Sequence, residues 1–191
     1  MTDSKDGLRL AVDILVFTVI KDKLNILLIQ RKNPPFQKMF AVPGGFVELN
    51  ESIREAVNRE LYEEAGIKNL KLHQLHAFGK PQRDPRGRVV TVSYIAFVNA
   101  DTISPKASSD ALSVKFSPID NLPELAFDHA SIVSFGTGEL KRIPNSFEVV
   151  KDYFKGLPSS QQLYDIYMVI KDDVVNKIAF QRLIESYLEI N

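Results

Sequence analysis

A cluster of acidic residues is the part of this sequence most able to do chemistry. Glu60, Glu63 and Glu64 stand at positions i, i+3 and i+4, a spacing that places three carboxylates on one face of a helix. Like charges so placed destabilise a helix unless a cation neutralises them. Carboxylate oxygens are ligands that Mg²⁺ and Mn²⁺ prefer, and Mg²⁺ commonly binds substrate phosphates as well. A bare run of glutamates is more often a solvated helix face, so the wider pattern decides between the two interpretations.

The glutamates lie in a segment that predicts one helix over residues 51–65. No proline or glycine interrupts it, and its apolar residues recur at helical spacing, at Ile53, Ala56, Val57, Leu61 and Ala65. Asn50 is suited to the N-cap, and Gly66 stands where a left-handed residue ends many helices. One face of this helix is therefore expected in the core, which leaves the acidic face available for a ligand.

The acidic cluster belongs to a longer pattern that favours chemistry. Gly45 is followed after five residues by Glu51, and after seven more by the segment 59–67, which reads Arg-Glu-Leu-Tyr-Glu-Glu-Ala-Gly-Ile. This arrangement matches the Nudix box at every signature position, so the chain resembles the Nudix (MutT-like) hydrolases. The resemblance implies an α/β/α sandwich with a mixed sheet, in which the box forms a loop-helix-loop. It also implies hydrolysis of a nucleoside diphosphate linked to another moiety, by a metal-activated water.

The resemblance also assigns roles to the residues of the box. Glu51 and Arg59 look like the pair that orders the loop and orients the metal carboxylates. The resemblance further implies that Mg²⁺ or Mn²⁺ is held by three side chains and one backbone carbonyl, those of Glu60, Glu63, Glu64 and Gly44.

The proton of the attacking water needs an acceptor. Metal ions bound to pyrophosphate oxygens neutralise charge in the transition state and lower the pKa of a bound water. A carboxylate would then remove the proton as general base. Glu64 or Glu60 is favoured for this role, and Asp110 and Asp128 are alternatives.

Residues outside the box extend the resemblance to one branch of the family. This branch contains enzymes similar to ADP-ribose pyrophosphatases and Nudix-derived transcription regulators with a C-terminal winged helix. The segments that resemble it are 27–32, 40–46, 83–88 and 125–129.

Several residues in these segments are candidates for substrate binding. Arg31, Arg83 and Arg86 carry guanidinium groups, which suit bidentate binding of a phosphate or contact with a ribose. Solvated loop arginines are an equally good interpretation of each one taken singly. Phe46 or Phe40 could stack on a base, although an aromatic residue beside a strand more often belongs to the core.

The order of elements predicts an α+β or sheet-helix sandwich fold rather than a Rossmann fold. Runs of apolar residues predict strands before and after the helix without regular βαβ alternation. From about residue 128 the pattern becomes helical, with helices expected at 130–140, 147–154, 161–171 and 177–187. We therefore divide the chain into a Nudix domain at 1–138 and a C-terminal helical segment at 139–191.

The C-terminal segment resembles a degenerate winged helix, in which the helices 161–171 and 177–187 form the helix-turn-helix. Residues 143–191 carry five basic and seven acidic side chains, whereas a recognition helix normally needs a basic surface. The chain also ends four residues after Tyr187, which leaves no room for a wing hairpin. Packing or dimerisation explains the segment better than DNA binding, so nucleic acid is an unlikely partner and homodimerisation is left open.

Composition is consistent with a globular protein of the cytoplasm. The chain has 191 residues, 24 basic and 24 acidic side chains and no cysteine, which excludes thiolate chemistry and an overall basic field for nucleic acid. Its apolar runs are too short to span a membrane, and no signal peptide is recognisable. The sequence thus predicts a Mg²⁺- or Mn²⁺-dependent pyrophosphohydrolase with ADP-ribose as the leading substrate. The alternatives are a regulator that senses an ADP-ribose or sugar effector, and a binding module without turnover.

Overall fold

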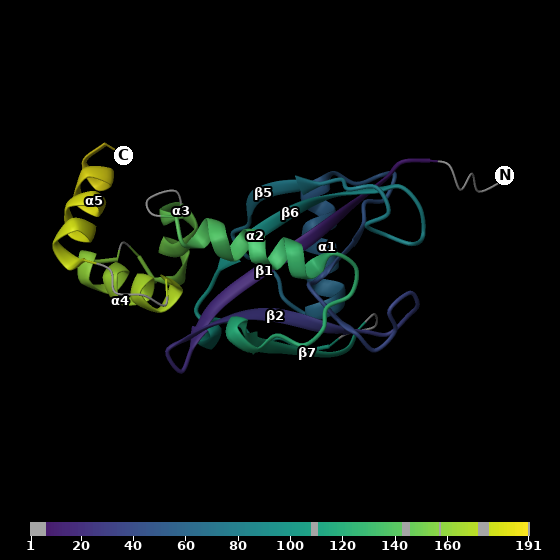
Figure 1. Cartoon of the computed structure of the whole chain (residues 1–191), viewed down its shortest axis with the longest axis horizontal. Coiled ribbons are helices and arrows are strands. Elements are labelled where there is room, and N and C mark those ends of the chain that lie inside the picture. Colours follow the sequence, from purple (N-terminus) through teal and green to yellow (C-terminus); the bar gives the residue numbers. More distant parts are fainter. Residues whose placement is uncertain (1–6, 108–110, 143–145, 157, 172–175, 191) are drawn as a thin grey trace.

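A mixed β-sheet with helices on both faces forms the body of the molecule (Figure 1). The computed structural model describes residues 7–107, 111–142, 146–156, 158–171 and 176–190. The strands are β1 (Arg9–Ile20), β2 (Lys23–Arg31), β3 (Phe40–Ala41), β4 (Gly44–Phe46), β5 (His73–Phe78), β6 (Val89–Phe97) and β7 (Ala111–Pro118). Their order is β3-β2-β1-β6-β5, with β4 paired to β1 and β7 paired to β2.

Strand β1 is the central strand and separates two cores. It runs parallel to β6 and antiparallel to β2 and β4. Its side chains alternate between the faces of the sheet, as the period of a strand requires. Val12, Ile14 and Val16 pack in the core beneath helix α1, whereas Leu15 and Phe17 pack in the core beneath helix α2. A strand buried on both faces explains the nearly continuous apolar run in the sequence.

Helix α1 (Ile53–Ala65) carries the box glutamates and is capped at both ends. The Ser52 hydroxyl accepts from the Glu55 amide, and the Glu55 carboxylate accepts from the Ser52 amide, which together form a capping box. Gly66 ends the helix with φ 68°, as expected. The N-cap prediction was wrong by two residues, because Ser52 rather than Asn50 supplies the cap.

Helix α2 (His129–Leu140) crosses the other face of the sheet and leads to the C-terminal helices (Figure 1). These are α3 (Phe147–Val150), α4 (Ser160–Lys171) and α5 (Lys177–Ile190). Only four residues of the expected helix 147–154 are α-helical, since a 3₁₀ turn over Lys151–Tyr153 follows α3. Phe147, Leu163 and Tyr167 belong to the same core as Phe17, so the helical segment packs on the sheet.

These elements confirm the predicted fold class, a mixed-sheet sandwich with a helical appendage. The boundary proposed after residue 138 falls inside the last turn of α2, and the two-part division stays a prediction. Among the described residues, no helix is both long and apolar enough to cross a membrane.

Candidate active site

Arg59 organises the acidic face of α1. Its guanidinium lies 2.6 Å from Glu51, 2.8 Å from Glu60 and 2.9 Å from Glu63. It also donates to the backbone carbonyl of Phe46 at 3.0 Å. The loop before the helix is therefore tied to the helix through one cation, and the predicted Glu51–Arg59 pair is present as an ion pair.

Gly44 and Gly45, the second of which begins the box, bring the backbone of β4 against the glutamates. The Gly44 amide donates to Glu64 Oε2 at 2.9 Å, so Glu64, which is 7% exposed, is held beside the backbone of this glycine. A Cβ on Gly45 would lie 2.1 Å from Glu60 Oε1. Only glycine leaves room there, which explains why the pattern requires this residue type at this spacing.

The side chains present fit a divalent metal in type and in place. Their donors are hard carboxylate oxygens, they share one helix face, and the glycine backbone lies against them. In the described part of the chain, no three carboxylate or histidine side chains converge in the manner of a formed metal site. Glu60 and Glu63 instead converge on the Arg59 guanidinium, which neutralises them.

Burial and charge shift the pKa values of this cluster in different directions. Partial burial raises the pKa of Glu60 above its ordinary value, and the contacts with Arg59 only partly offset this effect. The hydrogen bond from Arg59 lowers the pKa of Glu51. A carboxylate with a raised pKa is the better proton acceptor near neutral pH, so the electrostatics favour Glu60 over Glu51 as a base.

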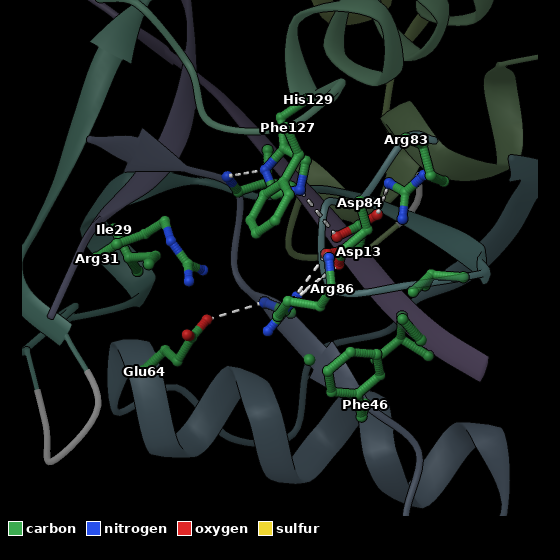
Figure 2. A pocket seen from close by; sticks show the side chains of 16 residues that line it. Asp13, Ile29, Arg31, Phe46, Glu64, Arg83, Asp84, Arg86, Phe127 and His129 are labelled. Carbon is green, nitrogen blue, oxygen red and sulfur yellow. Dashed lines mark hydrogen bonds and ion pairs between the residues drawn. The ribbon is translucent and has the colours of Figure 1, made fainter. Parts of the chain in front are cut away.

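A pocket opens beside the end of α1 (Figure 2). Figure 2 shows Glu64 of α1 on one side of this pocket and Phe127 and His129 on the opposite side. Arg31 and Arg86 line it as well, with guanidinium carbons 4.8 and 5.2 Å from the centre of the Phe127 ring. The cavity measures about 60 Å³, whereas pockets for small molecules measure roughly 300–1,000 Å³. A nucleotide would therefore have to displace side chains in order to enter.

Phe46 forms another wall of the pocket and has cationic neighbours. The Arg9 guanidinium lies 3.3 Å from the centre of its ring, and the Arg86 guanidinium lies 4.6 Å from it. Arg86 is also paired with Asp84 at 2.7 Å. The pocket thus combines aromatic faces with guanidinium groups, which suits a ligand that carries both a base and phosphates.

All four predicted substrate-binding residues line this pocket, but Arg83 differs from the others. Arg31, Phe46 and Arg86 are partly accessible, whereas Arg83 is 9% exposed. Its guanidinium makes two hydrogen bonds with Asp128, at 2.6 and 2.9 Å, and one with Asp13 at 3.2 Å. Of the alternative bases, Asp128 is bound in this way and Asp110 lies outside the described residues.

The pocket is also lined by Asp13, Phe127 and His129, which were not among the predicted site residues. Asp13 had a detectable signal, because it is a charged residue inside the apolar run of β1. His129 is buried and begins α2. Phe127 adopts φ 55°, a conformation that is uncommon for a bulky residue and is found most often at functional sites.

The fold and the box place the chain among known proteins. The family model of the NUDIX domain matches residues 7–134, and the chain belongs to the NUDIX family. The predicted family membership is thereby confirmed, and the prediction of a hydrolase of this family is supported.

One of two curated relatives is named as an enzyme, and the other is named as a transcriptional repressor. An ADP-ribose pyrophosphatase of Methanocaldococcus jannaschii is 43% identical over 120 residues, which covers 63% of this chain and 70% of that protein. The ADPR responsive transcriptional repressor NtrR of Acinetobacter baylyi is 33% identical over 181 residues, which covers 93% of this chain and 72% of the repressor.

Solved structures are similar both to the whole chain and to its NUDIX part. A MutT/nudix family protein from Enterococcus faecalis has a TM-score of 0.80 at 29% identity, covering 95% of this chain and 82% of that one. The NUDIX domain of Shewanella oneidensis NrtR, complexed with ADP ribose, has a TM-score of 0.66 at 32% identity. This similarity covers 71% of this chain and 90% of that domain.

Proposed function

We propose that this protein is a cytoplasmic hydrolase that depends on Mg²⁺ or Mn²⁺ and cleaves the pyrophosphate of a nucleoside diphosphate derivative, with ADP-ribose as the leading substrate. The observation that carries this proposal is that Glu64 of α1 lines the same pocket as Arg31, Arg86 and the ring of Phe127. The names of both curated relatives also refer to ADP-ribose.

In this proposal the helix α1 and the preceding glycine hold the metal. Glu60, Glu63, Glu64 and the Gly44 carbonyl would be its ligands, and Arg59 keeps the first two carboxylates in place beforehand. When bound, the metal supplies charge neutralisation at the pyrophosphate and a more acidic water. Rearrangement of Arg59 away from these oxygens would accompany binding.

The remaining residues of the pocket bind and orient the substrate. Arg31 and Arg86 would pair with phosphate oxygens, and Phe46 or Phe127 would stack against the base. Glu60, whose carboxylate lies close to the Gly45 backbone, would accept the proton of the attacking water. Glu64 is the alternative base.

Product analysis tests the proposal directly. The protein is incubated with ADP-ribose, NADH and nucleoside triphosphates, first with Mg²⁺ and then with Mn²⁺, and the products are separated by ion-exchange chromatography. We expect AMP and ribose 5-phosphate from ADP-ribose, formed only with added metal. If no compound is hydrolysed with either metal, the enzyme assignment is contradicted.

A regulator is the second candidate, because the similarity to the Acinetobacter repressor covers 93% of this chain and so goes beyond the NUDIX part at residues 7–134. The acidic balance of residues 143–191, seven acids against five bases, argues against strong DNA binding. Fluorescence anisotropy with labelled DNA of the chromosomal region upstream of the gene, with and without ADP-ribose, separates the two candidates. Sequence-specific binding that ADP-ribose reverses would favour the regulator, whereas weak binding equal for scrambled DNA would favour the hydrolase.

A further inference from the structure

A chain of hydrogen bonds and ion pairs runs along one wall of the pocket. The Val42 amide donates to His129 Nδ1 at 3.2 Å, and His129 Nε2 lies 3.3 Å from Asp13 Oδ1. The other oxygen of Asp13 accepts from Arg83 at 3.2 Å. Arg83 in turn makes its bidentate pair with Asp128. The chain therefore links the strand segment before Gly44 to the start of α2, where Phe127 stands.

The members of this chain are too buried to be explained as surface ion pairs. Asp13 is 5%, His129 5% and Arg83 9% exposed. Transfer of such groups from water costs several kcal/mol each before their mutual attraction is counted, and a buried ion pair is often no more stabilising than apolar residues. A contribution to the stability of the fold is thus a weak reason for a charged network here. A fixed geometry of the pocket is a stronger reason.

Asp128 pairs with Arg83 instead of capping helix α2. It occupies the N-cap of α2, a position where an aspartate normally accepts from a backbone amide of the first turn. Its side chain makes no such bond and is directed to Arg83 instead. Phe127, the residue before Asp128, has φ 55° and lines the pocket.

His129 has one tautomer that satisfies both of its neighbours. Because Nδ1 accepts from the Val42 amide, the proton of the neutral ring must be on Nε2, where it can be donated to Asp13. Val42 stands two residues before Gly44, whose backbone lies against Glu64. The imidazole thus holds the residue that precedes Pro43 and the glycine turn, beside the strand pairing of β4 with β1.

We propose that Asp13, Arg83, Asp128 and His129 form a positioning relay, which fixes the Gly44–Gly45 turn at one end and the Phe127 wall at the other. This inference rests on the proposed function and deepens it. It assigns Arg83 to the scaffold rather than to substrate phosphate, and it leaves Arg31 and Arg86 as the cations of the pocket that meet the ligand.

Two isosteric substitutions of His129 test the glycine end of the relay. In His129→Asn the amide oxygen can replace Nδ1 as the acceptor for Val42, while the link to Asp13 is lost. In His129→Gln the amide nitrogen can replace Nε2, while the Val42 amide loses its acceptor. Since a shift of ~1 Å at a reacting group can cost about 100-fold, we expect kcat to fall at least ~10-fold in His129→Gln and no more than ~3-fold in His129→Asn.

The other end of the relay is tested at Asp128 and Arg83. Asp128→Asn and Arg83→Lys both remove the bidentate pair but keep polar groups of similar size. For Asp128→Asn we expect KM for ADP-ribose to rise about 10-fold with kcat nearly unchanged, because Phe127 and not the glycine turn is released. Arg83→Lys also weakens the contact with Asp13, so it should raise KM to a similar extent and lower kcat as well. The double variant should be no worse than Arg83→Lys alone, since the pair with Asp128 is already lost there. Lys23→Gln, which removes an exposed ion pair with Asp120, is the matched control.

A readout without turnover separates failure of the relay from failure of the proposed function. Amide hydrogen exchange at Val42 in the full chain should accelerate in His129→Gln and stay slow in His129→Asn, whether or not the protein hydrolyses ADP-ribose. Equal Val42 exchange in the two variants, or equal loss of kcat, would overturn the glycine end. An unchanged KM in Asp128→Asn, with binding of ADP-ribose by calorimetry also unchanged, would overturn the Phe127 end.

Discussion

At the scale of single residues, Arg59 is the group around which the acidic face is built. A helix that carried Glu60, Glu63 and Glu64 without a cation would suffer repulsion among them. Arg59 bonds two of the three carboxylates directly, and Gly44 donates to the third. The cluster is consequently ordered by its own ion pairs and hydrogen bonds.

Removal of one box carboxylate should stop turnover without unfolding the protein. We expect Glu63→Gln or Glu64→Gln to reduce kcat/KM for ADP-ribose at least ~100-fold, because a metal ligand is lost while the repulsion among the glutamates is relieved. Steady-state kinetics at fixed Mg²⁺ concentration gives the activity, and circular dichroism checks the fold. Asp22→Asn in the exposed β1–β2 turn is the control. Turnover at the wild-type rate in either variant would count against the metal assignment.

The buried carboxyl of Asp13 should make stability depend on pH in acid. Burial raises the pKa of this group, but the contacts with His129 and Arg83 outweigh burial, and the pKa lies below its ordinary value of 3.8. The unfolded chain therefore takes up the proton at higher pH, so the stabilisation is present above about pH 4 and is lost as pH falls further. Urea unfolding from pH 3 to 7 should show a flatter decline for Asp13→Asn than for the wild type. Parallel curves below pH 4 would refute this.

At the scale of the elements, α2 is placed by a close contact with the sheet. A Cβ on Gly136 would lie 2.4 Å from Leu15 Cδ1, whereas a Cβ on Gly138 would meet nothing within 4 Å. The two glycines weaken the helix equally by propensity, so only packing explains the first. Gly136 allows the helix to approach β1, and the approach brings His129 at its start to the pocket.

The two glycines of α2 should respond oppositely to alanine. We expect Gly136→Ala to destabilise the protein by about 1–3 kcal/mol, because the methyl group overpacks the core. Gly138→Ala should stabilise it by up to about 1 kcal/mol through helix propensity. Urea denaturation of both variants gives the two free energies of unfolding, and each serves as the other's control. Equal effects of the same sign would contradict the packing explanation.

At the scale of the whole molecule, the C-terminal helices share a core with the sheet. Phe17 and Leu28 of the sheet lie in the same cluster as Phe147, Leu163 and Tyr167. The Tyr167 hydroxyl is also hydrogen-bonded to Ser146 at 2.8 Å within the buried region. The two parts proposed from the sequence are therefore joined by packing as well as by the chain.

A fragment of residues 1–142 should be less stable than the full chain. It loses the apolar side chains that cover one face of the sheet, and each kcal/mol lost lowers the thermal midpoint by roughly 2–4 °C in a protein of this size. We expect a drop of at least ~5 °C by calorimetry and a rise in binding of a hydrophobic dye. A midpoint equal to that of the full chain would show instead that the first 142 residues fold independently.

The features that depend on local spacing could be predicted from the sequence. The box glutamates and the apolar residues of α1 recur at the intervals that a helix imposes on any chain. Gly66 follows them at the position where a helix commonly ends. The alternation of β1 between two cores follows from the period of a strand. The error at the N-cap, Ser52 instead of Asn50, stayed within the usual uncertainty of helix ends.

Which distant residues contact one another follows from the tertiary structure and not from local spacing. Arg83 meets Asp13 across 70 positions and Asp128 across 45, and His129 reaches Val42 across 87. Periodicity reports which side of an element is buried, but it carries no information about which charged groups then meet. That depends on the parallel register of β1 with β6 and on how closely α2 approaches the sheet. The carboxylates of the box were therefore visible in the sequence, while the relay behind the pocket was not.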